Sequence, residues 1–197
     1  RPLLLIYRPG LLPDAKAWAE AWRRHCREAG VGEIYLAFVE SFEKAGGKTD
    51  PQSLGFDASV EFPPAGQGAL IHPPGPLFNA RFEGRVNDYR QMVRAYLSAE
   101  PPAHTRFRGI MPSWDNTPRR QDGGWAFQYA SPGAFQAWAE AMFEDTRRQN
   151  FGEERIVFIN AWNEWGEGAH LEPDQRFGHG WLEAVKNAAD ADILDKS

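Results

Sequence analysis

Two glutamates three residues apart, Glu164 and Glu167, are the side chains of this sequence whose type and spacing best suit chemistry. They follow an apolar run at residues 156–159, which is typical of a strand buried on both faces. Buried carboxylates are costly unless another group pairs with them. A buried strand that carries several polar groups to its carboxyl end therefore predicts the floor of an active site.

The spacing of the glutamates indicates how they act. In a continuing strand they would lie on opposite faces, roughly 10 Å apart, whereas in a bend they share one side, with Cβ atoms about 5–6 Å apart. Gly166 and Gly168 favour the bend, because glycine adopts positive φ without strain. Retaining glycosidases use two carboxyl groups about 5–5.5 Å apart and inverting ones about 6.5–9.5 Å. A pair of retaining type is therefore expected; the alternative is a solvated acidic loop after a core strand.

A resemblance to a known family begins at these residues. The segment 156–183, with AWNEWGEGAHLEPD at its centre, resembles the C-terminal signature of the glycoside hydrolase family 99-like domain, also called the WbsX-type family. Residues 5–9, 55–58 and 111–120 resemble the same family, in the same order along the chain. Family 99 enzymes are endo-acting α-mannosidases on a (β/α)8 barrel, and WbsX-type members often accompany bacterial surface-polysaccharide biosynthesis.

The resemblance assigns roles to the two carboxylates. It implies that Glu164 is the base that activates the substrate's own 2-hydroxyl, and that Glu167 is the general acid/base at the glycosidic oxygen. The neighbouring residues are expected to bind the substrate: Asn163, Trp165, His170 and Glu172. His170, Glu172 and Asp174 also have a spacing that metal ligands can use, but hydrogen bonds that shape the loop are favoured. We therefore expect no metal and no cofactor.

Polar side chains also follow other expected strands. After the strand at 107–111 come four candidates for binding the face and hydroxyls of a sugar: Trp114, Asp115, Asn116 and Arg119. An ordinary Asp/Asn-Pro turn is the alternative there. Tyr7 and Arg8 end the first strand, where the arginine would bind an anionic substrate group, orient a carboxylate or form a structural ion pair. Glu40 and Glu61 end the second and third strands, and a structural role is favoured for both.

Composition and length bound these expectations. The 197 residues fit a single domain, 1–197, and a net charge of −5 argues against a nucleic-acid surface. The single cysteine, Cys26, excludes an internal disulfide and is expected in the core. No stretch approaches the roughly 18 apolar residues of a membrane span. Because the chain begins at Arg1 and enters a strand at once, we expect the N-terminal part of the domain to be missing.

Strands and helices are predicted to alternate, which is typical of parallel βα units. Strands are expected at 3–7, 34–39, 58–62, 107–111 and 156–161; helices are expected from 14, 87 and 132 and around Trp181. Five such units fit an open doubly wound sheet or more than half of a (β/α)8 barrel, which takes about 250 residues. The resemblance favours a partial (β/α)8 barrel of about five βα units whose N-terminal strands are missing.

These observations predict a carbohydrate-active enzyme of retaining type, acting on glycosidic bonds in bacterial surface polysaccharide or mannose-like glycans. One alternative is a glycosyltransferase-associated domain in lipopolysaccharide or O-antigen biosynthesis, and another is a non-catalytic carbohydrate-binding module. The expected partners are an oligosaccharide or polysaccharide substrate and the missing N-terminal part of the same barrel. A bacterial, cytoplasmic location is favoured.

Overall fold

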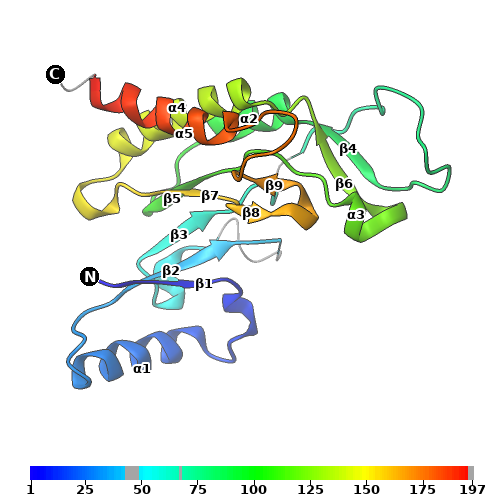
Figure 1. Cartoon of the computed structure of the whole chain (residues 1–197). Coiled ribbons are helices and arrows are strands. Elements are labelled where there is room, and N and C mark those ends of the chain that lie inside the picture. Colours follow the sequence, from blue (N-terminus) through cyan, green and yellow to red (C-terminus); the bar gives the residue numbers. More distant parts are fainter. Residues whose placement is uncertain (43–48, 67, 195–197) are drawn as a thin grey trace.

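The centre of the molecule is a five-stranded parallel sheet in the order β1-β2-β3-β5-β7. A computed structural model describes residues 1–42, 49–66 and 68–194. The strands are β1 (Leu3–Ile6), β2 (Tyr35–Glu40), β3 (Ala58–Glu61), β5 (Arg106–Ile110) and β7 (Val157–Ile159). All five run in the same direction, so their carboxyl ends meet at one edge of a curled sheet (Figure 1).

Among the described residues, the four longer helices pack against one face of this sheet. In β2, Leu36 and Phe38 face α1 (Ala15–Glu28), whereas Tyr35, Ala37 and Val39 face the opposite way and form a separate cluster with Val60 and Phe107. The register places Glu61 beside Glu40 and Arg106 beside Ser59, so the helix-bearing face continues across β3 to β5. An alternating pattern therefore separates an outer, helix-covered face from an inner apolar one.

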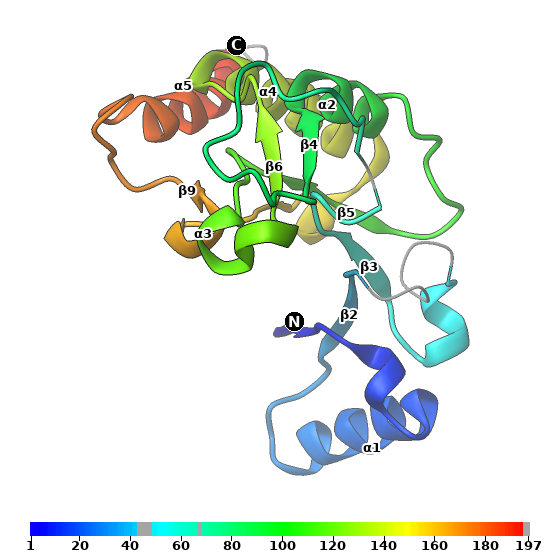
Figure 2. The same cartoon turned by 90° about the vertical axis from the view of Figure 1, so that its right-hand side faces the viewer.

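The largest core lies between β5, β7 and three helices, α2 (Tyr89–Leu97), α4 (Pro132–Gln149) and α5 (Gly180–Leu194). Trp138 of α4 and Trp181 of α5 are almost completely buried in it. These three helices gather at one end of the sheet, and α1 lies at the other (Figures 1 and 2). As the sequence predicts, Ser131 caps α4, its Oγ accepting from the Ala134 N–H, with proline at the first helical position.

Shorter strands and single turns complete the chain. The strands β4 (Arg85–Asp88) and β6 (Trp125–Gln128) pair in parallel, and β8 (Asn163–Glu164) pairs antiparallel with β9 (Ala169–His170). Five single-turn segments and one short helix lie between the longer elements: η1 (Pro9–Leu11), η2 (Pro51–Leu54), α3 (Thr117–Arg120), η3 (Gln121–Gly123), η4 (Gly152–Glu154) and η5 (Trp165–Glu167).

The paired strands β4 and β6, called here the β4–β6 ribbon, differ from the sequence prediction. A helix was expected from Asn87, but Asn87 belongs to β4 and the helix begins at Tyr89, because the Asp88 carboxylate accepts from the N–H groups of Arg90 and Gln91. The strand β6 was not expected. Each ribbon strand has only four residues, and its partner lies some forty residues away in the sequence, so local patterns could not reveal the pair.

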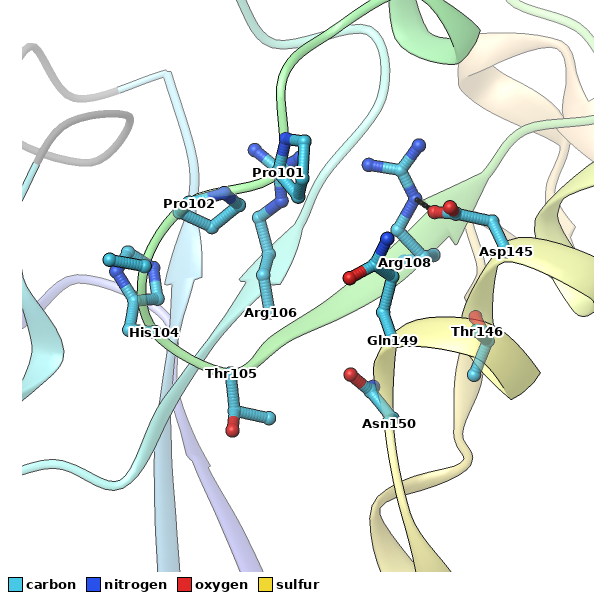
Figure 3. A pocket seen from close by; sticks show the side chains of 11 residues that line it. Pro101, Pro102, His104, Thr105, Arg106, Arg108, Asp145, Thr146, Gln149 and Asn150 are labelled. Carbon is cyan, nitrogen blue, oxygen red and sulfur yellow. Dashed lines mark ion pairs between the residues drawn. The ribbon is translucent and has the colours of Figure 1, made fainter.

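A buried ion-pair cluster ties β3, β5 and α4 together on the outer face. The Glu61 carboxylate lies 2.7 Å from Arg108 Nη1 and 3.2 Å from Arg106 Nη2, and Arg108 Nε lies 3.0 Å from the Asp145 carboxylate. Figure 3 shows the two arginines of β5 and the Arg108–Asp145 pair, which line a polar cavity of about 270 Å³. Burial raises the pKa of Glu61, while Arg108 and Arg106 oppose that rise.

This cluster gives Glu61 the structural role that the sequence favoured. Glu40 has a similar place, because its carboxylate accepts a 2.6 Å hydrogen bond from Ser59 Oγ on the same outer face. Both carboxylates therefore point towards the helix side of the sheet. The paired glutamates Glu164 and Glu167 come instead from the loop after β7.

Replacing Glu61 tests the cluster. Glu61→Ala would leave two arginines buried without their carboxylate, and we expect the free energy of unfolding to fall by about 3–5 kcal/mol in a denaturant titration. Glu33→Ala is the matched control, since Glu33 forms a 3.0 Å ion pair with Arg27 in which both side chains are half exposed, and little change is expected there. Equal losses in the two variants would contradict the role assigned to the cluster.

Candidate active site

A tight bend after β7 sets the positions of the two glutamates. The chain leaves the sheet, forms the pair β8 and β9, and turns between them through η5. Gly168 has a φ of 62° at the end of this turn, a conformation that side chains disfavour. The turn directs Glu164 and Glu167 to a common partner, as the sequence predicts for a bend and not for a continuing strand.

That partner is Arg119, which lies on α3 after β5. Its Nη2 lies 2.5 Å from Glu164 Oε1 and its Nη1 lies 3.3 Å from Glu167 Oε1. Because both oxygens contact one planar guanidinium, they lie within about 8 Å of each other. A separation in that range accommodates either the retaining or the inverting geometry. All three side chains are partly exposed, so a ligand can reach them.

Close packing fixes the arginine over the bend. A Cβ atom on Gly166 would lie 2.5 Å from Arg119 Nε and 2.7 Å from its Nη2, so only glycine leaves room beneath the guanidinium. The loops after β5 and β7 are also joined by their backbones. The Asp115 N–H donates to the Glu167 carbonyl at 2.7 Å, and Ser113 Oγ donates to the Gly168 carbonyl.

Gly166→Ala tests this arrangement. The atoms that the new methyl group would meet are the end of a flexible side chain. We therefore expect the fold to persist, while Arg119 moves away from Glu164 and Glu167. A crystal structure of the variant reads out both contacts, and Gly133→Ala on α4 is the control, because a Cβ there meets nothing within 4 Å. An unmoved Arg119 in the Gly166 variant would show that the close approach is not restrictive.

An exposed indole stands beside the glutamates. Trp165 is 48% exposed, and its ring stacks on His170 with centroids 3.8 Å apart and an interplanar angle of 16°. Its Nε1 donates to Glu172 Oε2 at 2.6 Å. Such a ring, held on one face and at one edge, offers a rigid surface of the kind on which a sugar ring stacks.

Hydrogen bonds also hold His170, the residue on which the Trp165 ring stacks. His170 Nε2 lies 3.1 Å from Asp174 Oδ2, which accepts from Trp181 Nε1 at 3.0 Å. Burial acts to raise the pKa of Asp174, but the Phe177 N–H, His170 and Trp181 hydrogen bonds hold that pKa below its usual value. His170, Glu172 and Asp174 thus make the loop-shaping contacts favoured from the sequence. Within the described residues, no group of three or more His, Cys, Asp or Glu side chains is arranged to hold a metal ion.

A cavity of about 590 Å³, called here the aromatic cavity, opens next to Glu167. Five aromatic residues from several strand ends line it: Tyr7, Phe42, Phe62, Trp114 and Trp125. Its polar lining is formed by Glu83, Arg85, Asn116, Arg120 and Glu167. The cavity therefore combines flat apolar surfaces with a few charged groups, which is typical of small-molecule sites.

The structure gathers most of the residues predicted for the site. Tyr7, Trp114, Asn116 and Glu167 line the aromatic cavity, and Arg119, Glu164, Trp165, His170 and Glu172 make the contacts described above. Asp115 uses its Oδ1 to accept from the Thr117 N–H and hydroxyl, the turn contact that was the alternative to sugar binding. Arg8 and Asn163 are exposed and are not among the residues that line the cavity.

Sequence reasoning missed the part of the cavity that the β4–β6 ribbon supplies. Arg85 lies on β4 and Trp125 on β6, and Phe42 and Phe62 follow β2 and β3. Arg120 directly follows a residue that was predicted. The alternation of Trp125 and Phe127 with smaller or polar residues is the one local signal that pointed to a strand.

The architecture defines a class of protein: an α/β protein with a curled parallel sheet of five strands, helices on its outer face and paired carboxylates beyond its carboxyl edge. The chain belongs to the family described as Glycosyltransferase WbsX, whose model matches residues 1–185. The resemblance found in the sequence is thereby confirmed. Membership of this family supports a carbohydrate-active protein.

Curated relatives and a solved structure are also similar to this chain. The chain is 43% identical over 193 residues to proteins called "Uncharacterized protein WxcX" from two strains of Xanthomonas campestris pv. campestris, covering 95% of this chain and 27% of each relative. A solved structure called "Glycoside hydrolase-like protein" matches with a TM-score of 0.60 and 15% identity, over 95% of this chain and 54% of that one. This second likeness concerns the fold. Within the described residues, no helix has the length and apolar character to cross a membrane.

Proposed function

We propose that this chain carries the catalytic carboxylates of an enzyme that acts on glycosidic bonds by a retaining mechanism, on bacterial surface polysaccharide or mannose-like glycans. The observation that carries the proposal is the convergence of Glu164 and Glu167 on one guanidinium, beyond the carboxyl edge of a parallel sheet. Active sites of α/β barrels lie at that edge. The neighbouring indole of Trp165 and the aromatic cavity supply surfaces for sugar rings.

Each carboxylate has a distinct role in the proposed reaction. Glu164 takes the proton of the substrate's 2-hydroxyl, whose oxygen attacks the anomeric carbon from one face. Glu167 gives a proton to the departing glycosidic oxygen, then takes one from the water that attacks the anomeric carbon, while Glu164 returns its proton to the 2-oxygen as the bond between that oxygen and the anomeric carbon breaks. Two successive displacements at one carbon retain its configuration.

The remaining strands are proposed to come from the same polypeptide. The chain spans 27% of the curated relatives and 54% of the solved chain that it matches. We infer that residues 1–197 form the C-terminal part of a (β/α)8 barrel, with β1 and β7 as the strands that join the rest. Substrate contacts from the other strands would then complete the site.

Glycosyl transfer is the second candidate, favoured by the description of the family as a glycosyltransferase. The same two carboxylates would serve, with an acceptor sugar hydroxyl in place of water. Glu167 would take the proton of that hydroxyl as its oxygen attacks the anomeric carbon. The products distinguish the two reactions, because hydrolysis creates a new reducing end and transfer does not.

Charge-removing variants of the full-length protein test the roles. On a glycan panel with reducing-end analysis, Glu164→Gln and Glu167→Gln are each expected to lower turnover by about 10²–10⁴-fold. A substrate with a very good leaving group needs little protonation, so it should restore part of the activity of Glu167→Gln and none of that of Glu164→Gln. Glu183→Gln, on the exposed side of α5, is the matched control and should retain full turnover.

The outcomes separate catalysis from simple binding. Wild-type turnover in both glutamine variants would assign these glutamates a structural role. Glycan binding without any turnover in the wild-type protein, combined with weaker binding in the variants, would indicate a carbohydrate-binding module instead.

A further inference from the structure

We propose that the aromatic cavity binds a sugar residue that carries a carboxylate, of the uronic acid kind, next to the bond on which Glu167 acts. The inference rests on the proposed function and narrows its substrate to acidic glycans. It comes from charged side chains of the cavity that have no ion-pair partner among the described residues.

Two arginines provide unpaired positive charge at the cavity. Arg85 is the register partner of Trp125 in the β4–β6 ribbon, so both side chains project from the same face of that ribbon, and both line the cavity. Arg120 reaches the cavity from α3, one residue after Arg119. Across the described ranges, neither Arg85 nor Arg120 forms an ion pair, whereas Arg119 is committed to two glutamates.

The other uncommitted groups are mainly hydrogen-bond donors. The indole Nε1 atoms of Trp114 and Trp125 are buried and have no acceptor among the described residues. Asn116 has already used its side-chain oxygen, which accepts from the Trp125 N–H at 2.6 Å. The two indole Nε1 atoms are shielded from solvent, so a ligand does not meet them directly. The exposed guanidinium groups of Arg85 and Arg120 are the donors that a ligand can reach, and they favour a ligand with acceptor oxygens.

The acidic side chains at the cavity do not remove the need for an anion. Glu167 contacts Arg119, which leaves Glu83 as the carboxylate of the described lining without a side-chain partner. Glu83, Arg85 and Arg120 are all exposed, so solvent and salt screen the repulsion of an anion by Glu83 and its attraction by the arginines alike, and two guanidiniums against one carboxylate leave a net attraction. Glu83 is also suited to accept from a sugar hydroxyl, and it leaves the positive charge of two guanidiniums for the ligand.

A sugar that carries a carboxylate suits both the charged and the aromatic side chains of this cavity. A guanidinium matches the two oxygens of a carboxylate with paired N–H donors, and the aromatic rings provide surface for the pyranose face. The volume of about 590 Å³ lies within the range of small-molecule sites. Because Glu167 forms part of the wall, a ring held here lies next to the acid/base group.

The placement has a catalytic consequence. Binding energy from a charged group that does not react can be used to orient the reacting bond. An acidic residue seated between Arg85 and Arg120 would hold the glycosidic oxygen near Glu167. Neutral glycans, which lack that group, should then lose rate as well as affinity.

The test compares two forms of one glycan on the full-length protein. The probes are an oligosaccharide that contains glucuronic acid and the same oligosaccharide after chemical reduction of its carboxyl groups. Binding is measured by calorimetry and by quenching of tryptophan fluorescence, and turnover by product analysis. The acidic form is expected to bind at least about tenfold tighter, with an advantage that shrinks as salt is raised.

Variants of the two cavity arginines test whether the preference for the acidic glycan arises in the cavity. Arg85→Gln and Arg120→Gln should each reduce the ratio of acidic to neutral binding several-fold, and the double variant should bring it close to one. Arg24→Gln, an exposed arginine of α1 outside the cavity, is the matched control and should leave the ratio unchanged. A glycan with a phosphate in place of the carboxylate separates a general preference for anions from one for a sugar carboxylate. Tighter binding of the phosphorylated glycan would overturn the assignment to a uronic acid.

Failure of this inference is distinguishable from failure of the proposed function. Equal affinity for the two forms, tighter binding of the neutral form or binding of neither would overturn the acidic-sugar assignment. Turnover of a neutral glycan that depends on Glu164 and Glu167 would meanwhile uphold glycosidic chemistry. Preferential binding of the acidic form without turnover of any glycan would support the cavity assignment and count against the enzyme.

Discussion

The buried pairing of Glu61 with Arg106 and Arg108 is the interaction on which the arrangement of the sheet depends. Charges taken out of water destabilise a fold unless each meets a partner, so these side chains restrict how β3 can lie against β5. The Arg108–Asp145 pair adds α4 to the same restriction. Once β5 is placed, the segment that follows it carries Trp114, Asn116 and Arg119 to the carboxyl edge.

The second constraint is the common direction of the strands. Parallel strands bring every strand end to one edge, and here the helices occupy only the outer face. Loops after β5 and β7 are therefore neighbours, although some fifty residues separate them. The backbone bond from Asp115 to Glu167 and the side-chain bridge of Arg119 both follow from that neighbourhood. The chemistry of the site thus derives from topology more than from any single motif.

The sequence revealed the parts that have local causes. Apolar runs predicted all five strands of the main sheet, the Ser131-Pro132 cap predicted the start of α4, and two glycines predicted the bend that carries Glu164 and Glu167. The β4–β6 ribbon could not be predicted, because its four-residue strands are stabilised by pairing across the chain. For the same reason Arg85 and Trp125 were missed. Asp115 shows that residue type alone can also predict a contact that the structure does not use. An aspartate at this position suited a ligand contact, but its carboxylate caps the following turn.

The contact between Gly166 and Arg119 links two positions that lie far apart in the sequence. The guanidinium occupies the space that any side chain at position 166 would need. A larger residue at 166 displaces the guanidinium, so the bridge from Arg119 to Glu164 and Glu167 requires glycine at that position. The lack of a side chain at Gly166 is thus as necessary to the geometry of this site as the charges of Arg119 and the two glutamates.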